Sequence, residues 1–261
     1  MKWTWTEDFR IRGYEVGADG AVPVQSLCAY MEEAASLHAD ELGFSVEALQ
    51  TRGLSWALAR MQLELYALPT TGDLVRVKTW PAGVDKLQYR RDFILSGQDN
   101  ITFARAITEW VIINLESRRL ERVPQFITAL QPSAPEYALE KEKLRLEEQD
   151  NAPELLSFRV RKADIDRNRH VNNVRFLDWI LESVPDEISG SRKLAGLQVM
   201  YRAEARYGDT VLARGSMRSG ISANNEDEVS AEKNAGGLEF AHGLYRCSDG
   251  LELVRAKTVW K

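Results

Sequence analysis

The sequence predicts an α+β fold made of two copies of one unit, each a long helix wrapped by a curved antiparallel sheet. Two observations support this prediction. Each half of the chain shows the order strand, helix and four strands, and residues of the two halves match in the same order along the chain. The chain has 261 residues, which is enough for two domains of ordinary size.

The first half begins with a strand expected at 9–16, followed by a helix from Pro23 to a stop at Gly43. The buried face of this helix is predicted to contain Val24, Leu27, Cys28, Met31, Ala35, His38 and Leu42. A short helix at 45–52 and strands near 56–67, 73–80, 86–96 and 102–115 follow. The stretch Gly97-Gln98-Asp99-Asn100 is expected to form a hairpin turn.

Residues 123–157 differ in composition, with three prolines and the charged run EKEKLRLEEQD. This segment is predicted to be a linker, partly helical and mostly on the surface. The predicted domains are therefore 1–122 and 158–261, with the linker 123–157 between them.

The second half repeats the first in the same order, at an offset of 149 or 150 residues at both ends and of 136 in the middle, where Leu68 is the counterpart of Glu204. FRIR at 9–12 returns as FRVR at 158–161, an offset of 149, which also aligns the Pro23 helix with a helix near Asn172. ARAITEW at 104–110 returns as VRAKTVW at 254–260. The polar stretch 219–237 is expected to be a loose hairpin connection within the second copy.

The candidate site lies in DIDRNRHVNNVRFLDWILES, residues 164–183. Asp166, Asn168 and His170 alternate along the chain, so their side chains converge if the backbone is extended. Asn172 or Asn173 is a suitable N-cap for the following helix. An acid, an amide and an imidazole would then meet backbone N–H donors at a helix start, where a developing oxyanion is stabilised.

Three other interpretations compete with a catalytic site. A calcium loop fails, since Arg169 and Arg175 stand where the loop requires Gly and Glu. A polar turn that caps the helix and a structural His170 stay open. The counterparts of Asp166, Asn168 and His170 in the first copy are Gly17, Asp19 and Ala21, which favours a site confined to the second copy.

Composition excludes several classes of protein. A net charge of −5 argues against a general nucleic-acid binder, and 44% hydrophobic with 28% charged residues indicates a globular chain. Two cysteines and three histidines suggest neither a disulfide framework nor a metal cluster. No apolar run is long enough to cross a membrane, and the N-terminus has no signal pattern, so we expect a cytoplasmic protein.

The segment around His170, together with Tyr201-Arg202-Ala203-Glu204, resembles the acyl-ACP thioesterases, a family of fused double hot-dog proteins, in their bacterial form. The resemblance implies a catalytic network of Asp166, Asn168, His170 and Glu204, with no cofactor or metal. Many plant members have Cys directly after this Glu, whereas this chain has Ala205, so a carboxylate-and-water mechanism is favoured. Without the resemblance, Glu204 would be an ordinary exposed strand residue.

The activity implied is hydrolysis of fatty acyl-[acyl carrier protein] by residues 158–261, with residues 1–122 binding the acyl chain. The implied partners are acyl carrier protein (ACP) with its acyl-phosphopantetheine arm and, as an open question, a second copy in a homodimer; neither nucleic acid nor membrane is expected. An acyl-CoA thioesterase and a non-catalytic acyl-binding protein are the alternatives. The candidate basic docking residues are Arg90, Arg91, Arg118, Arg119, Arg167 and Arg169.

Overall fold

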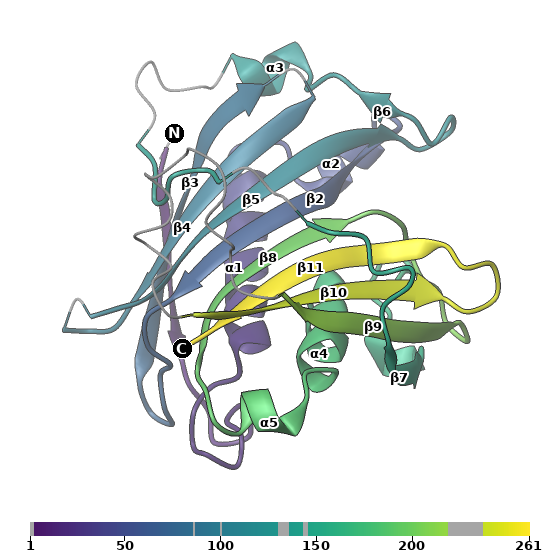
Figure 1. The fold of residues 1–261 in the computed structure, drawn as a ribbon. Coiled ribbons are helices and arrows are strands. Elements are labelled where there is room, and N and C mark those ends of the chain that lie inside the picture. Colours follow the sequence, from purple (N-terminus) through teal and green to yellow (C-terminus); the bar gives the residue numbers. More distant parts are fainter. Residues whose placement is uncertain (1–2, 86, 100, 130–135, 143–145, 219–236) are drawn as a thin grey trace, which may run out of the picture. The chain divides into compact units, whose positions relative to one another are not determined.

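The protein is represented by a computed structural model that describes residues 3–85, 87–99, 101–129, 136–142, 146–218 and 237–261. The chain divides into two compact units, unit 1 (Met1–Glu142) and unit 2 (Lys143–Lys261). Each unit carries antiparallel strands and a helix packed against them, which confirms the predicted α+β class (Figure 1). Among the described residues, no helix has the length and apolar character needed to span a bilayer.

Unit 1 combines one long helix with an antiparallel sheet. Its elements are β1 (Trp5–Arg10), α1 (Val24–Glu41), α2 (Val46–Gln50), β2 (Leu54–Leu65), β3 (Leu74–Asp85), β4 (Gln88–Ser96), β5 (Thr102–Asn114), β6 (Leu120–Glu121) and α3 (Gln125–Thr128). The strand order is β1-β3-β4-β5-β2, and β6 pairs with β5. The strand expected at 9–16 is wrong in position, because β1 ends at Arg10 and the chain then enters turns.

Helix α1 lies where the sequence predicts it. Pro23 occupies its N-cap position, and Gly43 follows its C-cap residue, Leu42, with a φ of 79° that favours glycine. The predicted stripe is buried throughout: Val24, Leu27, Cys28, Met31, Ala35, His38 and Leu42. This stripe covers one face of the sheet, where α1 contacts β1 and β3.

Unit 2 repeats the arrangement with shorter elements. They are β7 (Glu154–Arg159), the 3-10 turn η1 (Lys162–Asp164), α4 (Asn173–Glu182), α5 (Asp186–Ser189), β8 (Leu194–Tyr201), β9 (Thr210–Arg218), β10 (Leu238–Arg246) and β11 (Glu252–Trp260). The strand order β7-β9-β10-β11-β8 corresponds to that of unit 1, which confirms the repeat. The stretch 219–236, expected to be a hairpin connection, lies outside the described residues.

Helix α4 is shorter than expected. A helix of about 16–20 residues is predicted for each unit, but α4 has 10 residues, whereas α1 has 18. Ser183 Oγ donates to Ile180 O (2.8 Å) at the helix end, and Pro185 cannot donate the N–H that would continue the helix. The chain instead turns into α5 directly after Pro185.

The same side-chain hydrogen bond occurs within each of the two units. Trp110 Nε1 donates to Thr108 Oγ1 (2.9 Å) in unit 1, and Trp260 Nε1 donates to Thr258 Oγ1 (2.8 Å) in unit 2. These pairs lie in the matching sequences ARAITEW and VRAKTVW. The repeat is therefore present in the sequence, the topology and the local bonding.

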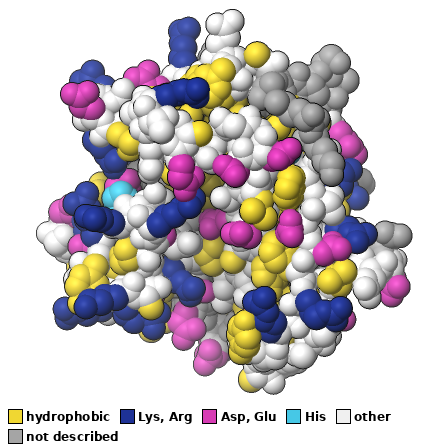
Figure 2. Space-filling model, turned by 180° about the vertical axis from the view of Figure 1, so that it is seen from behind, with side chains coloured by type: hydrophobic (Ala, Val, Ile, Leu, Met, Phe, Trp, Pro, Cys, Tyr) yellow, Lys and Arg dark blue, Asp and Glu magenta, His cyan; other side chains and the backbone are white. Residues whose placement is uncertain are grey.

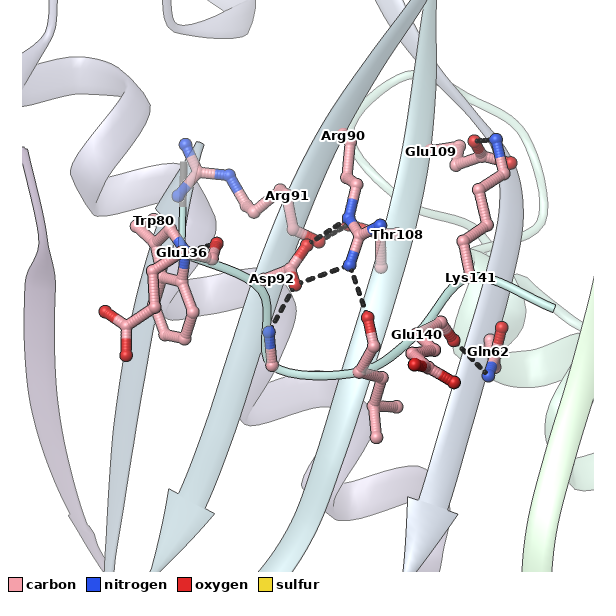
Figure 3. A network of polar contacts seen from close by, with 12 residues as sticks. Gln62, Trp80, Arg90, Arg91, Asp92, Thr108, Glu109, Glu136, Glu140 and Lys141 are labelled. Atoms are coloured by element: carbon pink, nitrogen blue, oxygen red, sulfur yellow. Dashed lines mark hydrogen bonds and ion pairs between the residues drawn. The ribbon is translucent and has the colours of Figure 1, made fainter. Parts of the chain in front are cut away.

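The segment 136–142 was expected to be part of a surface linker. It instead packs against the strands of unit 1 through buried polar groups. The fully buried carboxylate of Asp92 accepts two bonds from Arg90 (2.6 and 2.7 Å) and one from Ala138 N (2.7 Å). Arg90 also donates to Leu139 O (2.8 Å) (Figure 3). These bonds hold the segment in an extended path across the strands.

The segment 146–150 is bound in the same way to unit 2. Gln149 N donates to Tyr245 Oη (3.2 Å), and Ser216 Oγ donates to Gln149 Oε1 (2.9 Å). The described part of the charged run 140–150 contains no helix. β7 also begins within the predicted linker, at Glu154, so much of 123–157 belongs to one unit or the other.

Candidate active site

Asp166, Asn168 and His170 lie on a tight turn between η1 and α4. Asp166 N donates to His170 O (2.9 Å), and Arg169 N donates to Asp166 O (3.0 Å). Arg169 has a φ of 63°, which folds the chain back on itself. The prediction of an extended backbone is therefore wrong, although the side chains of Asp166 and Asn168 do meet, with Asn168 Nδ2 3.3 Å from Asp166 Oδ2.

The Asp166 carboxylate holds this turn closed. Its Oδ1 accepts from the backbone N–H groups of Asn168 (2.8 Å) and His170 (3.4 Å), and its Oδ2 accepts from Asn168 Nδ2 (3.3 Å). These are the contacts expected of the polar-turn alternative.

His170 pairs with Glu204 from a distant part of the sequence. His170 Nε2 lies 3.0 Å from Glu204 Oε2, and the two side chains are 22% and 39% exposed, so water reaches both. Glu204 lies in an irregular segment after β8 and not in a strand, contrary to its alternating sequence pattern. A carboxylate in contact with an imidazole orients the ring, and together they can accept a proton from water.

Main-chain bonds fix the Glu204 segment beside the turn. Val171 N donates to Ala205 O (2.9 Å), and Arg246 donates to Glu204 O (3.3 Å). The sequence analysis does not identify Arg246, because it lies on β10 with no motif around it. These bonds join three separate parts of unit 2 into one site.

The start of α4 leaves one main-chain donor near the turn. Val171 N and Asn172 N are engaged by Ala205 O and Asp164 O (2.9 Å each), so neither is available to a ligand. Asn172 caps the helix by accepting from Val174 N (2.8 Å), as predicted. Among the described residues, Asn173 N has no hydrogen-bond partner, so it is the candidate oxyanion donor.

Asp164, which precedes the turn, is buried and bound to Arg161. Its carboxylate, with a side chain only 1% exposed, accepts from Arg161 N (2.7 Å) and from the Arg161 guanidinium (2.8 and 3.1 Å). Burial alone raises the pKa of Asp164, but the hydrogen bonds and charge of Arg161 outweigh it and hold that pKa below its ordinary value. Asp164 therefore belongs to the framework of the site.

Unit 1 contains the same turn, with Gly17, Asp19 and Ala21 in place of Asp166, Asn168 and His170. Gly17 N donates to Ala21 O (2.9 Å) and Gly20 N to Gly17 O (3.0 Å), which matches the bonds of Asp166, His170 and Arg169. Val22 N donates to Pro69 O (2.9 Å), as Val171 N does to Ala205 O. The turn is thus a feature of the fold, whereas the Asp166 carboxylate and the His170 imidazole have Gly17 and Ala21 as their counterparts and are particular to unit 2.

Other candidate groups take no part in this site. Cys28 is buried, and burial raises the pKa of its thiol, whereas Cys247 is exposed. Within the described ranges, no three His, Cys, Asp or Glu side chains form a potential metal site. Arg91 is 3% exposed, beside His38 Nδ1 (3.0 Å), and Arg90 binds Asp92, so these two are wrong as surface docking residues.

Comparison with protein families finds two matches in sequence order. The model described as the acyl-ACP thioesterase N-terminal domain matches residues 2–130. The model described as the acyl-ACP thioesterase C-terminal domain matches residues 147–261.

Individual proteins show the same similarity. The chain is 31% identical to oleoyl-acyl carrier protein thioesterase 1 of Arabidopsis thaliana, over 99% of this chain and 76% of that protein. It is 33% identical to the palmitoyl-acyl carrier protein thioesterase of Gossypium hirsutum, over 98% and 63%. Among solved structures, the 12:0-ACP thioesterase from Umbellularia californica is 27% identical with a TM-score of 0.83, over 99% and 94%.

Proposed function

Because this chain belongs to the acyl-ACP thioesterase family, we propose that it hydrolyses fatty acyl-ACP to a free fatty acid and holo-ACP. The observation that carries the proposal is the contact between His170 Nε2 and Glu204 Oε2 (3.0 Å), on a turn whose counterpart in unit 1 has Ala21 in place of His170. This pair supplies the base that hydrolysis requires.

In the proposed mechanism, the His170–Glu204 pair takes a proton from a water molecule as its oxygen attacks the thioester carbonyl carbon. The tetrahedral intermediate then expels the thiolate, and the proton is returned to the sulfur. One thioester and one water thus give one carboxylic acid and one thiol. A thiolate is a good leaving group, so the proposed reaction uses neither a cofactor nor a metal.

Asn173 N is proposed to bind the carbonyl oxygen as negative charge develops on it. Because Asn173 lies in the first turn of α4, the positive end of the helix dipole also stabilises this negative charge. One such donor contributes about 3–4 kcal/mol in well-studied enzymes. Asp166 and Asn168 are proposed as positioning residues, because their hydrogen bonds hold the turn that carries His170.

The acyl chain is proposed to bind to unit 1. Its turn has Gly17, Asp19 and Ala21 where unit 2 has the site residues, and Leu68 where unit 2 has Glu204. Helix α1 around Met31–Leu42 and strand β2 around Trp56–Leu65 offer apolar side chains for this purpose. The cytoplasmic location and the homodimer stay predictions; light scattering of the purified protein tests the second.

The proposal is tested with purified protein and acyl-ACP substrates of several chain lengths, with loss of the acyl group followed by mass spectrometry of the carrier. Wild-type protein is expected to convert acyl-ACP to holo-ACP, and the His170→Ala variant is expected to lose most of this activity. Acyl-CoA thioesters of the same lengths are tested in parallel. Hydrolysis of acyl-CoA with no turnover of any acyl-ACP would replace the proposed donor by CoA, and no hydrolysis of either would refute thioesterase activity.

A further inference from the structure

Arg169 has a backbone conformation that is unusual for a residue with a side chain. Its φ of 63° lies in the left-handed region, where a Cβ crowds the neighbouring carbonyl. Among the described non-glycine residues, only Arg118 shares a positive φ. A residue in such a conformation at a candidate site suggests that its side chain has a function.

The repeat shows which residue this position favours. Gly20 occupies the equivalent place in the turn of unit 1, with a φ of 77° and the same backbone hydrogen bond of 3.0 Å. Glycine adopts this conformation without strain. Unit 2 therefore keeps an arginine where the same turn is made with glycine in unit 1, although the bond pattern gives the arginine no advantage for folding.

Arg169 lies on the turn that carries His170, and several other cationic residues lie on this turn and on the segment that follows Glu204. It is exposed and directly precedes His170 in the chain. Arg167 is on the same turn as Arg169. Arg206 and Tyr207 lie in the segment that follows Glu204, and Lys162 Nζ is 5.9 Å from the centre of the Tyr207 ring. On the face shown in Figure 2, several Lys and Arg side chains lie around the exposed histidine surface, together with acidic and hydrophobic side chains.

The acids that lie nearest to Arg169 in the sequence are engaged by other groups. The Asp164 carboxylate is engaged by Arg161, and Asp166 is engaged by N–H groups of its own turn. Asp209 accepts from the backbone N–H of Arg206 (2.8 Å), and Arg206 is exposed. No ion pair joins Arg169 to a described acid. A locally positive rim on a chain of net charge −5 favours an anionic ligand.

We infer that Arg169 binds the phosphodiester of the substrate's phosphopantetheine arm and so orients the thioester toward His170 and Glu204. A guanidinium presents several N–H donors in a geometry that suits phosphate oxygens. The phosphate is a fixed part of the arm, so binding it restricts how the thioester enters the site. This role rests on the proposed thioester hydrolysis.

A matched pair of substrates tests the role of Arg169 directly. Acyl-pantetheine and acyl-4′-phosphopantetheine differ by one phosphate, and both are assayed with wild type, Arg169→Gly, Arg169→Ala and Arg169→Lys. For the phosphorylated substrate, Arg169→Gly and Arg169→Ala are expected to raise KM about fivefold at low ionic strength with kcat unchanged, and Arg169→Lys less. For acyl-pantetheine, KM is expected to stay at the wild-type value.

Arg192→Ala is the matched control, because it removes another exposed arginine of unit 2, between α5 and β8. It is expected to leave both KM values unchanged. Melting curves check that Arg169→Gly is folded, which the Gly20 turn leads us to expect. The KM effect of Arg169 should also shrink as salt is added, because an exposed charge contact is screened.

The possible failures are distinguishable. Equal KM changes for the two small substrates, or none for either, would overturn the phosphate contact while leaving hydrolysis intact. An effect seen only with acyl-ACP would also overturn it and would assign Arg169 to the carrier protein surface. Failure of the wild type to hydrolyse any of these thioesters would instead refute the proposed function.

Discussion

Replacing Glu204 with glutamine is the sharpest change at the proposed base. The amide keeps the size of the side chain and an oxygen that can face His170 Nε2, but it removes the charge and the proton acceptor. Loss of a general base typically lowers rates by about 10²–10⁴-fold, so we expect a fall of this size in kcat. This corresponds to roughly 3–5 kcal/mol of activation free energy.

Stability should change far less than activity. The Glu204 side chain is 39% exposed, and ion pairs with this exposure contribute up to about 1 kcal/mol. For a chain of this size the melting temperature should then fall by no more than about 2–4 °C. A large loss of turnover with a nearly unchanged melting temperature separates a chemical role from a structural one.

The assay is release of free thiol from saturating acyl-ACP, with thermal melting followed by circular dichroism. Glu154→Gln is the matched control, because Glu154 also pairs with a cation in unit 2, Arg214 (2.9 Å), and is exposed. It should retain the wild-type kcat. A folded Glu204→Gln protein whose kcat stays within about threefold of wild type would contradict the role of Glu204 as base.

Three further predictions concern the framework and the cysteines. Asp164→Ala should lower the free energy of unfolding by about 2 kcal/mol, because Arg161 N loses its acceptor. The pKa of Asp164 is lowered in the folded state, so the stabilisation by its carboxylate is present above pH 3.8 and is lost as the pH falls through the lower folded-state pKa. The free energy of unfolding, measured against pH for wild type and variant, checks this. Parallel curves for the two proteins would contradict it. Asp92→Ala should cost roughly 3 kcal/mol in urea unfolding, because it breaks the buried pair with Arg90 and releases the segment 136–142, and a change below about 1 kcal/mol would show that this pair does not hold the segment. Cys28→Ala and Cys247→Ser should keep turnover, and a loss beyond about tenfold in folded protein would contradict the carboxylate mechanism.

The architecture could be predicted well from the sequence, because the two halves repeat the same elements in the same order. The offsets derived from short matches align β1 with β7, and the stripe of α1 is buried as its spacing requires. The length of α4 was missed, because the apolar pattern continues through Val184 while Pro185 ends the helical bonding. Helical periodicity records which face is buried and does not record where the hydrogen bonds stop.

The site was predicted by residue type but not by geometry. The contact of His170 with Glu204 agrees with the resemblance, although Glu204 was expected in a strand and lies beyond one. Asp166 and Asn168 bond within the turn, which alternation could not indicate. The positive φ of Arg169 has no local signal, but its alignment with Gly20 could have suggested it.

Direct attack by water in unit 2 is tested most directly by a single turnover in water enriched in oxygen-18. Enzyme in excess over acyl-ACP converts each substrate molecule once, and mass spectrometry then locates the label. If the His170–Glu204 pair activates water, one labelled oxygen should appear in the fatty acid and none in the protein. Label in the carboxylate of Asp166 or Glu204 would instead show an anhydride intermediate and would contradict the proposed mechanism.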